Sequence, residues 1–171
     1  MRNAIVGSLL IAAVSTAGDF VWAGLNLRHR VIYGLAHGAI LFACIGAYFG
    51  LLDRRMLRGA MSGAGIGLAA AGTFYVLAPI AGYSIMFFIW AFVWIALAFV
   101  AGTRPAVWRG VLAMIGSGVG FYLISGIWRP FDPEGWDYAI HFLSWAFAYL
   151  PGFAALLATR ARKAPARSHA V

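Results

Sequence analysis

The sequence predicts an all-α integral membrane protein, a single bundle of six transmembrane helices with both termini in the cytoplasm. Of its 171 residues, 63% are hydrophobic and only 11% are charged, and the mean hydropathy is +0.85. A soluble domain carries about 25% charged residues, so this chain has too few polar groups to cover a surface that faces water. The apolar residues also fall into six runs, each long enough for the roughly 20 residues that cross a bilayer core.

The six apolar runs follow one another with short connections. None of the connections is long enough to form another domain, so residues 1–160 are predicted to be one transmembrane domain. Residues 161–171 are basic and contain proline, and they predict a disordered cytoplasmic tail. The predicted spans cover residues 4–27, 31–52, 57–79, 83–102, 106–128 and 138–160.

The basic residues predict the orientation of these spans. Cytoplasmic connections are rich in Lys and Arg, and an even number of spans places both termini on one side. Arg28 and Arg30, and Arg129 among acidic residues, fall on the opposite side. The predicted cytoplasmic side collects Arg2, Arg54, Arg55, Arg58, Arg104, Arg109, Arg160, Arg162, Lys163 and Arg167.

The net charge of +8 bears on partners and localisation. In a soluble protein it would suggest nucleic acid, but here the charges lie between apolar runs, where they meet anionic lipid headgroups. Membrane lipids are therefore the expected partners, and nucleic acid is not. Twelve of the thirteen basic residues are arginine, which is typical of a high-GC bacterium and predicts a bacterial cytoplasmic (inner) membrane.

A second interpretation of the N-terminus stays open. Residues 1–17 have the basic start, short apolar core and small residues of a cleavable signal peptide. Cleavage after Ala17 would leave five spans. The apolar run continues through residues 20–27, which favours an uncleaved first span.

Small residues predict how the first three spans and the fifth pack. Lipid gives apolar helices no hydrophobic reason to associate, so transmembrane helices pack closely through Gly, Ala, Ser and Thr. On the first span, small and polar residues spaced by three and four share one helical face: Ser8, Ala12, Ser15, Asp19, Trp22 and Asn26. A similar stripe on the third span comprises Ser62, Gly65, Ala69 and Thr73. Pairs of glycines four residues apart are Gly34/Gly38, Gly46/Gly50, Gly59/Gly63, Gly63/Gly67 and Gly116/Gly120.

The fourth and fifth spans differ from each other. The fourth is bulky and aromatic, and we expect it to pack outside the bundle or to line a groove of lipid size. The fifth places Gly110, Ser117 and Ser125 on one side, with Tyr122 nearby.

Three ionisable side chains lie inside predicted spans, where they are costly and mark candidate functional sites. At about 1.5 Å per residue, Asp19 and His37 lie at similar depths in the outer half of the membrane, and His141 lies nearer the outer surface. Because the first two spans are adjacent and antiparallel, Asp19 and His37 are predicted to be partners. Such a pair could be a polar clamp between helices, the orienting end of a ligand cavity, or a site of chemistry.

The chemical alternatives differ in their support. Zinc held by Asp19, His37 and His141 would have three protein ligands and an open position, but no typical ligand spacing is present. A b-type haem between His37 and His141 is compatible with their depths. A serine nucleophile is the third alternative, but the sequence contains no Gly-x-Ser-x-Gly motif to support it.

Residues 110–152, GVLAMIGSGVGFYLISGIWRPFDPEGWDYAIHFLSWAFAYLPG, resemble part of the Insig family of sterol-sensing membrane proteins and their bacterial relatives. The likeness covers that family's fifth span, its Pro-Asp-containing outer loop and its sixth span with a Ser-Trp pair, here Ser144-Trp145. Elsewhere the resemblance is one of span pattern. It implies a lipid- or sterol-like ligand in a central cavity. The eukaryotic members engage a partner through an acidic residue in the fourth connection, but residues 102–105 here contain no acid, so no functional residue is carried over.

These observations predict a small membrane protein that binds a lipid or sterol-like ligand among its helices, as a sensor, carrier or accessory subunit. A homo-oligomer or a partner membrane protein is compatible with this function. The alternative is an intramembrane enzyme, or a haem- or metal-binding protein, that uses Asp19, His37 and His141; no cofactor and no catalytic residue is assigned. The candidate ligand-binding residues are Asp19, Trp22, His37, Thr73, Tyr75, Tyr122, Ser125, His141 and Trp145.

Overall fold

The computed structural model describes residues 1–25, 29–82, 84–100, 112, 113, 115–119 and 135–161. Within these ranges the chain is helical and contains no strand. Residues 112, 113 and 115–119 are also helical and belong to the predicted fifth span. The helices with assigned bounds are α1 (Arg2–Leu25), α2 (Arg30–Leu52), α3 (Met56–Ala81), α4 (Ile85–Val100) and α6 (Gly135–Ala161).

Four of the described helices, α1, α2, α3 and α6, are long and apolar enough to cross a membrane, which supports an integral membrane protein. The remaining helix with assigned bounds, α4, is also apolar but has only 16 residues. Each of these five helices begins and ends within a few residues of a predicted span. The predicted disordered tail lies outside the described residues, apart from Ala161 at the end of α6.

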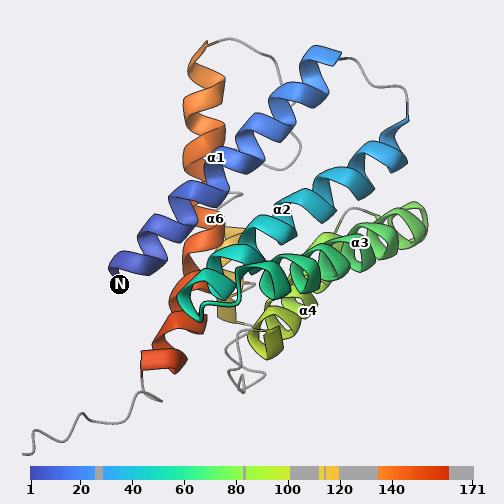
Figure 1. Ribbon diagram of the computed structural model, residues 1–171. Helices are drawn as coiled ribbons and strands as arrows, with labels where there is room; N and C mark the ends of the chain where they lie inside the picture. Colours follow the sequence, from blue (N-terminus) through green and yellow to red (C-terminus); the bar gives the residue numbers. More distant parts are fainter. Residues whose placement is uncertain (26–28, 83, 101–111, 114, 120–134, 162–171) are drawn as a thin grey trace, which may run out of the picture.

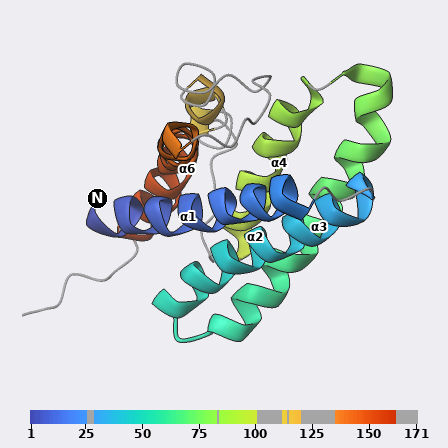
Figure 2. The ribbon, with the colours of Figure 1, turned by 90° about the horizontal axis from the view of Figure 1, so that it is seen from above.

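The helices pack mainly in two pairs. α1 crosses α6, whereas α2 and α3 form a close antiparallel pair with α4 packed against α3 (Figures 1 and 2). α1 makes far less contact with α2, although the two follow each other in sequence. Sequence neighbours are therefore not the closest neighbours at α1.

Glycines bring α2 and α3 into backbone contact. A Cβ atom at Gly46 would overlap the carbonyl oxygen of Gly59, and one at Gly63 would overlap that of Phe42. A Cβ at Gly67 would likewise overlap the carbonyl oxygen of Gly38. The prediction that these glycine pairs pack helices closely is thus confirmed for α2 and α3.

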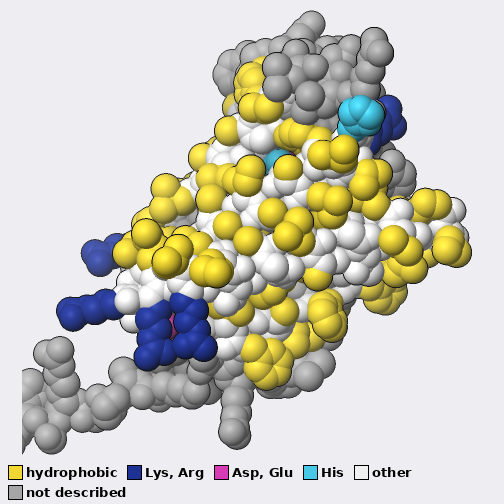
Figure 3. Space-filling view, turned by 45° about the vertical axis from the view of Figure 1, so that its right-hand side comes forward, with side chains coloured by type: hydrophobic (Ala, Val, Ile, Leu, Met, Phe, Trp, Pro, Cys, Tyr) yellow, Lys and Arg dark blue, Asp and Glu magenta, His cyan; other side chains and the backbone are white. Residues whose placement is uncertain are grey.

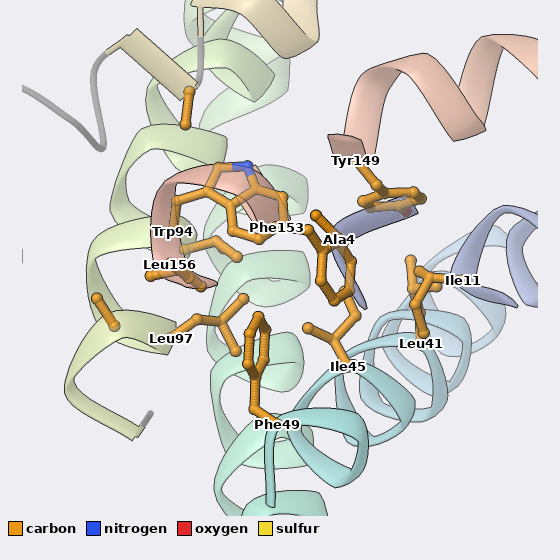
Figure 4. Close-up of a cluster of buried hydrophobic side chains, with 13 residues drawn as sticks. Ala4, Ile11, Leu41, Ile45, Phe49, Trp94, Leu97, Tyr149, Phe153 and Leu156 are labelled. Atoms are coloured by element: carbon orange, nitrogen blue, oxygen red, sulfur yellow. The ribbon is translucent and has the colours of Figure 1, made fainter. Parts of the chain in front are cut away.

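An aromatic and aliphatic core lies where the two pairs meet (Figure 4). The rings of Phe49 from α2 and Phe153 from α6 stack with their centroids 5.1 Å apart. Trp94 from α4 meets Phe153 edge to face at 5.9 Å. Leu97 and Ile45 are fully buried beside them. These contacts connect α2, α4 and α6 near the ends of α2 and α4.

The surface matches a protein that faces lipid. Hydrophobic side chains cover much of the face seen in Figure 3, and a cluster of arginine side chains lies at one end of it. Large exposed apolar residues include Ile32, Ile40, Val76, Phe88 and Phe92. A belt of this kind would be unfavourable in water.

Candidate functional site

The carboxylate of Asp19 joins α1 to α6. Its Oδ2 lies 2.6 Å from Nε2 of His141 and 3.0 Å from Nε1 of Trp145. His141 and Trp145 are four residues apart on α6, so both side chains lie on one helical face. The side chains of His141 and Asp19 are 16% and 28% exposed, so the cluster is largely removed from solvent.

The donors and acceptors in this cluster can be assigned from their chemistry. The indole N–H of Trp145 only donates, and an ionised carboxylate only accepts. With Nε2 of His141 protonated, both groups donate to Oδ2 of Asp19. The 3.1 Å separation of the indole and imidazole nitrogens then follows from their shared acceptor. Two donors to one oxygen lower the cost of keeping this carboxylate inside the bundle.

The same face of α6 continues as an aromatic column. Residues 141, 145, 149 and 153 recur every four positions, and the rings of Trp145 and Tyr149 stack 5.5 Å apart. Trp90 of α4 stacks on both rings, at 5.9 Å from each. The hydroxyl of Tyr149 lies 3.0 Å from that of Ser15 on α1. The column therefore connects the Asp19 cluster to the buried core.

The predicted pairing of Asp19 with His37 is wrong. Among the described residues, the hydrogen bonds of Asp19 go to α6, while the ring of His37 lies against Gly18 and 5.8 Å from the ring of Tyr33. The Tyr33 hydroxyl donates to the carbonyl oxygen of Gly18. The physical reason is that α1 packs on α6 through its small face and turns that face away from α2.

The three residues for which the depth count predicts similar positions nevertheless lie close to one another. His37 contacts Gly18, the residue before Asp19, and Asp19 contacts His141. The predicted inward face of α1 is confirmed for Ser8, Ala12 and Ser15, each at most 2% exposed. Ser8 also donates a hydrogen bond to the carbonyl oxygen of Ala146.

A central cavity of about 200 Å³ lies next to the Asp19 cluster. It is lined from four helices, and its walls include three of the predicted site residues, His37, Tyr75 and Trp145. Trp145 thus belongs to both the polar cluster and the cavity wall. The hydroxyl of Tyr75 reaches Gly34 on α2, where a Cβ atom would overlap it.

A larger groove runs between α3 and α4 and adjoins that cavity. Its volume is about 620 Å³, and it shares Ala70, Ile89 and Val93 with the central cavity. The predicted stripe of small residues on α3 forms one wall, comprising Ser62, Gly65, Ala69 and Thr73. Phe88 and Phe92 of α4 form the facing wall. The aromatic fourth span thus lines a groove, which is one of the two arrangements expected for it.

Thr73 contributes little polarity to this groove. Its hydroxyl donates to the carbonyl oxygen of Ala69, one turn earlier on the same helix, at 2.8 Å. Gly65 faces open space, because no atom would lie within 4 Å of a Cβ built on it. The groove is consequently an almost purely apolar surface.

Three predicted site residues lie outside this description. Tyr122 and Ser125 fall outside the described residues, and the structure describes only the backbone of Trp22. Among the residues that it does describe, no group of three His, Cys, Asp or Glu side chains could hold a metal ion. The proposed zinc site of Asp19, His37 and His141 is therefore not assembled.

Sequence reasoning missed Tyr149, Trp90 and Tyr33. Tyr149 could have been found from its place four residues after Trp145, which continues the face that begins at His141. Trp90 carried no such signal, because aromatic residues surround the whole of α4. Tyr33 lies one turn before His37 and could have been grouped with it.

Comparison of the chain with protein-family models, with curated proteins and with solved structures finds no match.

Proposed function

We propose that this protein is a six-span bacterial inner-membrane protein, with both termini cytoplasmic, that binds a lipid or sterol-like molecule among its helices. Its role would be that of a sensor, a carrier or an accessory subunit. The observation that carries this proposal is the groove of about 620 Å³ between α3 and α4, with its apolar walls. Pockets for small molecules have volumes of about 300–1,000 Å³ and are lined mainly by apolar groups.

The length of the groove supports a chain-like ligand. Its lining on α3 extends from Ser62 to Leu77, which corresponds to about 22 Å along a helix. One leaflet of a bilayer core is about 15 Å thick, so the groove is long enough for an extended acyl chain or a fused-ring body. The resemblance of residues 110–152 to the Insig family implies a ligand of the same class.

The central cavity and the Asp19 cluster have a supporting place in this proposal. At about 200 Å³ the cavity is too small for a whole lipid, and it adjoins the groove at Ala70, Ile89 and Val93. It can take a small part of a ligand whose main body lies in the groove. His37 and Tyr75 would then contact that part with polar atoms, and Trp145 would contact it with its ring.

The experiment narrows the groove at Gly65. Because this position faces open space, Gly65→Leu adds a side chain into the groove without meeting another helix. We expect lipid that co-purifies with wild-type protein, identified by mass spectrometry, to be lost from Gly65→Leu and retained by Gly65→Ala. Ala139→Leu, which introduces the same side chain at an exposed position of α6, should also retain it.

Other outcomes would contradict the proposal. Full retention of lipid by Gly65→Leu would show that the groove is not the site. A Soret absorbance, or stoichiometric metal that disappears in His37→Ala but persists in Gly65→Leu, would favour the haem- or metal-binding alternative.

A further inference from the structure

A polar pocket continues the α3–α4 groove at one end. It has a volume of about 650 Å³ and is lined by the turn between α2 and α3, the first turns of α3, and the end of α4. Ser62 lines both spaces, so the pocket and the groove meet there. Phe99 and Val100 of α4 form the apolar side of the pocket.

Among the described residues that line this pocket, the charged ones are two arginines and one acid. Arg55 and Arg58 line it, and in the described part of the chain neither forms an ion pair with a carboxylate. Asp53 also lines the pocket, and its carboxylate would repel an anion. Two guanidinium groups against one carboxylate leave the pocket positive. Arginine side chains also gather at one end of the molecule in Figure 3, with an acidic side chain among them.

The spacing of these groups matches the two parts of an amphipathic ligand. Arg58 precedes Ser62 by one helical turn, and Arg55 precedes it by about two. A phosphate in the pocket would therefore lie directly beyond the end of the apolar groove. Guanidinium groups bind phosphate oxygens through paired, charge-assisted hydrogen bonds. Anionic phospholipids also give the cytoplasmic leaflet its negative surface potential, and positive connections favour that side.

We propose that the ligand is an anionic glycerophospholipid, whose phosphate is bound by Arg55 and Arg58 and whose acyl chain lies in the α3–α4 groove. The inference rests on the proposed function, to which it adds the class of lipid and the site of its headgroup. Neither space alone specifies this ligand. The apolar groove would accept any chain, and the basic pocket would accept any small anion.

The test measures headgroup preference. Purified full-length protein in mild detergent is titrated with phosphatidylglycerol or with diacylglycerol, which carries the same acyl chains but no phosphate, and bound lipid is counted by native mass spectrometry. We expect wild-type protein to bind phosphatidylglycerol about tenfold more tightly, as the loss of a hydrogen bond to a charged group implies. The double variant Arg55→Gln/Arg58→Gln should lose this preference and still bind diacylglycerol as wild type does.

Arg54 supplies the matched control. It lies beside Arg55 and carries the same charge but does not line the pocket. Arg54→Gln should keep the preference, and inorganic phosphate should not displace the bound lipid. Equal loss in Arg54→Gln would overturn the inference in favour of general surface attraction, and displacement by phosphate would overturn it in favour of a free anion.

The two proposals fail in different ways. Equal binding of both lipids by wild-type protein would overturn the anionic headgroup and leave the apolar groove as a lipid site. Absence of binding by either lipid, or unchanged binding of both by Gly65→Leu, would overturn the proposed function itself. If the double arginine variant fails to fold, Arg58→Gln alone should show a reduced preference, and an unchanged one would contradict the inference.

Discussion

The α2–α3 pair and the α1–α6 pair belong to one bundle but are held together by different kinds of contact. Between α2 and α3 the backbones touch, because glycines such as Gly46 and Gly63 leave no side chain between them. Between α1 and α6, polar side chains bridge the helices, with the carboxylate of Asp19 bonded to His141 and Trp145. The α2–α3 interface depends on the lack of side chains at its glycines, and the α1–α6 interface depends on hydrogen bonds between specific side chains.

This difference determines how each interface can fail. A glycine contact is spread along the helices and tolerates no added atom, so its variants should be destabilised by overlap. A polar contact is local, and its variants should be destabilised because a buried partner loses its hydrogen bond. The three following predictions test that distinction in order of expected effect.

The largest effect should come from Gly63→Ala. A methyl group there would overlap the carbonyl oxygen of Phe42, and separating two packed helices costs about 3 kcal/mol at the upper end of the overpacking range. Gly72→Ala on the same helix is the matched control, because its Cβ would meet Leu35 at an ordinary 3.9 Å. Thermal unfolding in detergent should show a large loss for the first variant and none for the second. Equal stability of the two variants would mean that the backbones are not in contact.

An intermediate effect is expected from Asp19→Ala. It leaves His141 and Trp145 without their shared acceptor, at a cost of about 2 kcal/mol in unfolding free energy. Asp19→Asn keeps an acceptor and should cost less.

A double-mutant cycle then distinguishes the partners of Asp19. Asp19→Ala and His141→Ala should be non-additive, because contacting residues couple. Asp19→Ala and His37→Ala should couple much more weakly, because these two side chains interact electrostatically without a hydrogen bond. The reverse pattern would restore the pairing predicted from the sequence and contradict the observed one.

The smallest effect should come from Ser15→Ala. This variant removes a single hydrogen bond to the Tyr149 hydroxyl, and such bonds in membrane proteins contribute about 0.6 kcal/mol on average. Tyr149→Phe removes the same bond from the other side. The double variant should therefore be no less stable than the more affected single variant. Full additivity in the same unfolding assay would show that the two hydroxyls do not interact.

The sequence predicted the glycine interface better than the polar one, for a physical reason. Gly46 and Gly63 each belong to a pair of glycines four residues apart, and this spacing alone predicts close packing. Their helices are also consecutive in the sequence. The partner of Asp19 lies 122 residues away, and nothing local to either residue specifies the contact. Depth narrowed the choice to His37 and His141, and the rule of adjacent spans then selected the wrong histidine. The polar face of α1 packs on α6 because of how the complete surfaces of the helices fit together, which no local sequence pattern specifies.

The two stripes on α3 show a similar limit. The stripe that contains Gly63 and the one that contains Gly65 are equally rich in small residues, so the sequence predicts close packing for both. In the structure the first faces α2, and the second faces the groove. The bulky residues of α4 explain the difference, because Phe88 and Phe92 line the groove opposite α3 where small residues would allow close packing.

The hydrogen bond between Asp19 and His141 also has a consequence for biosynthesis. α1 emerges from the ribosome long before α6. At about 5–20 residues per second, the sequence separation of 122 residues takes on the order of ten seconds to synthesise. During that interval the carboxylate of Asp19 has neither of its α6 partners. A nascent chain that stalls before α6 thus presents an acidic group inside an apolar segment, a feature by which membrane quality control can recognise an incomplete copy.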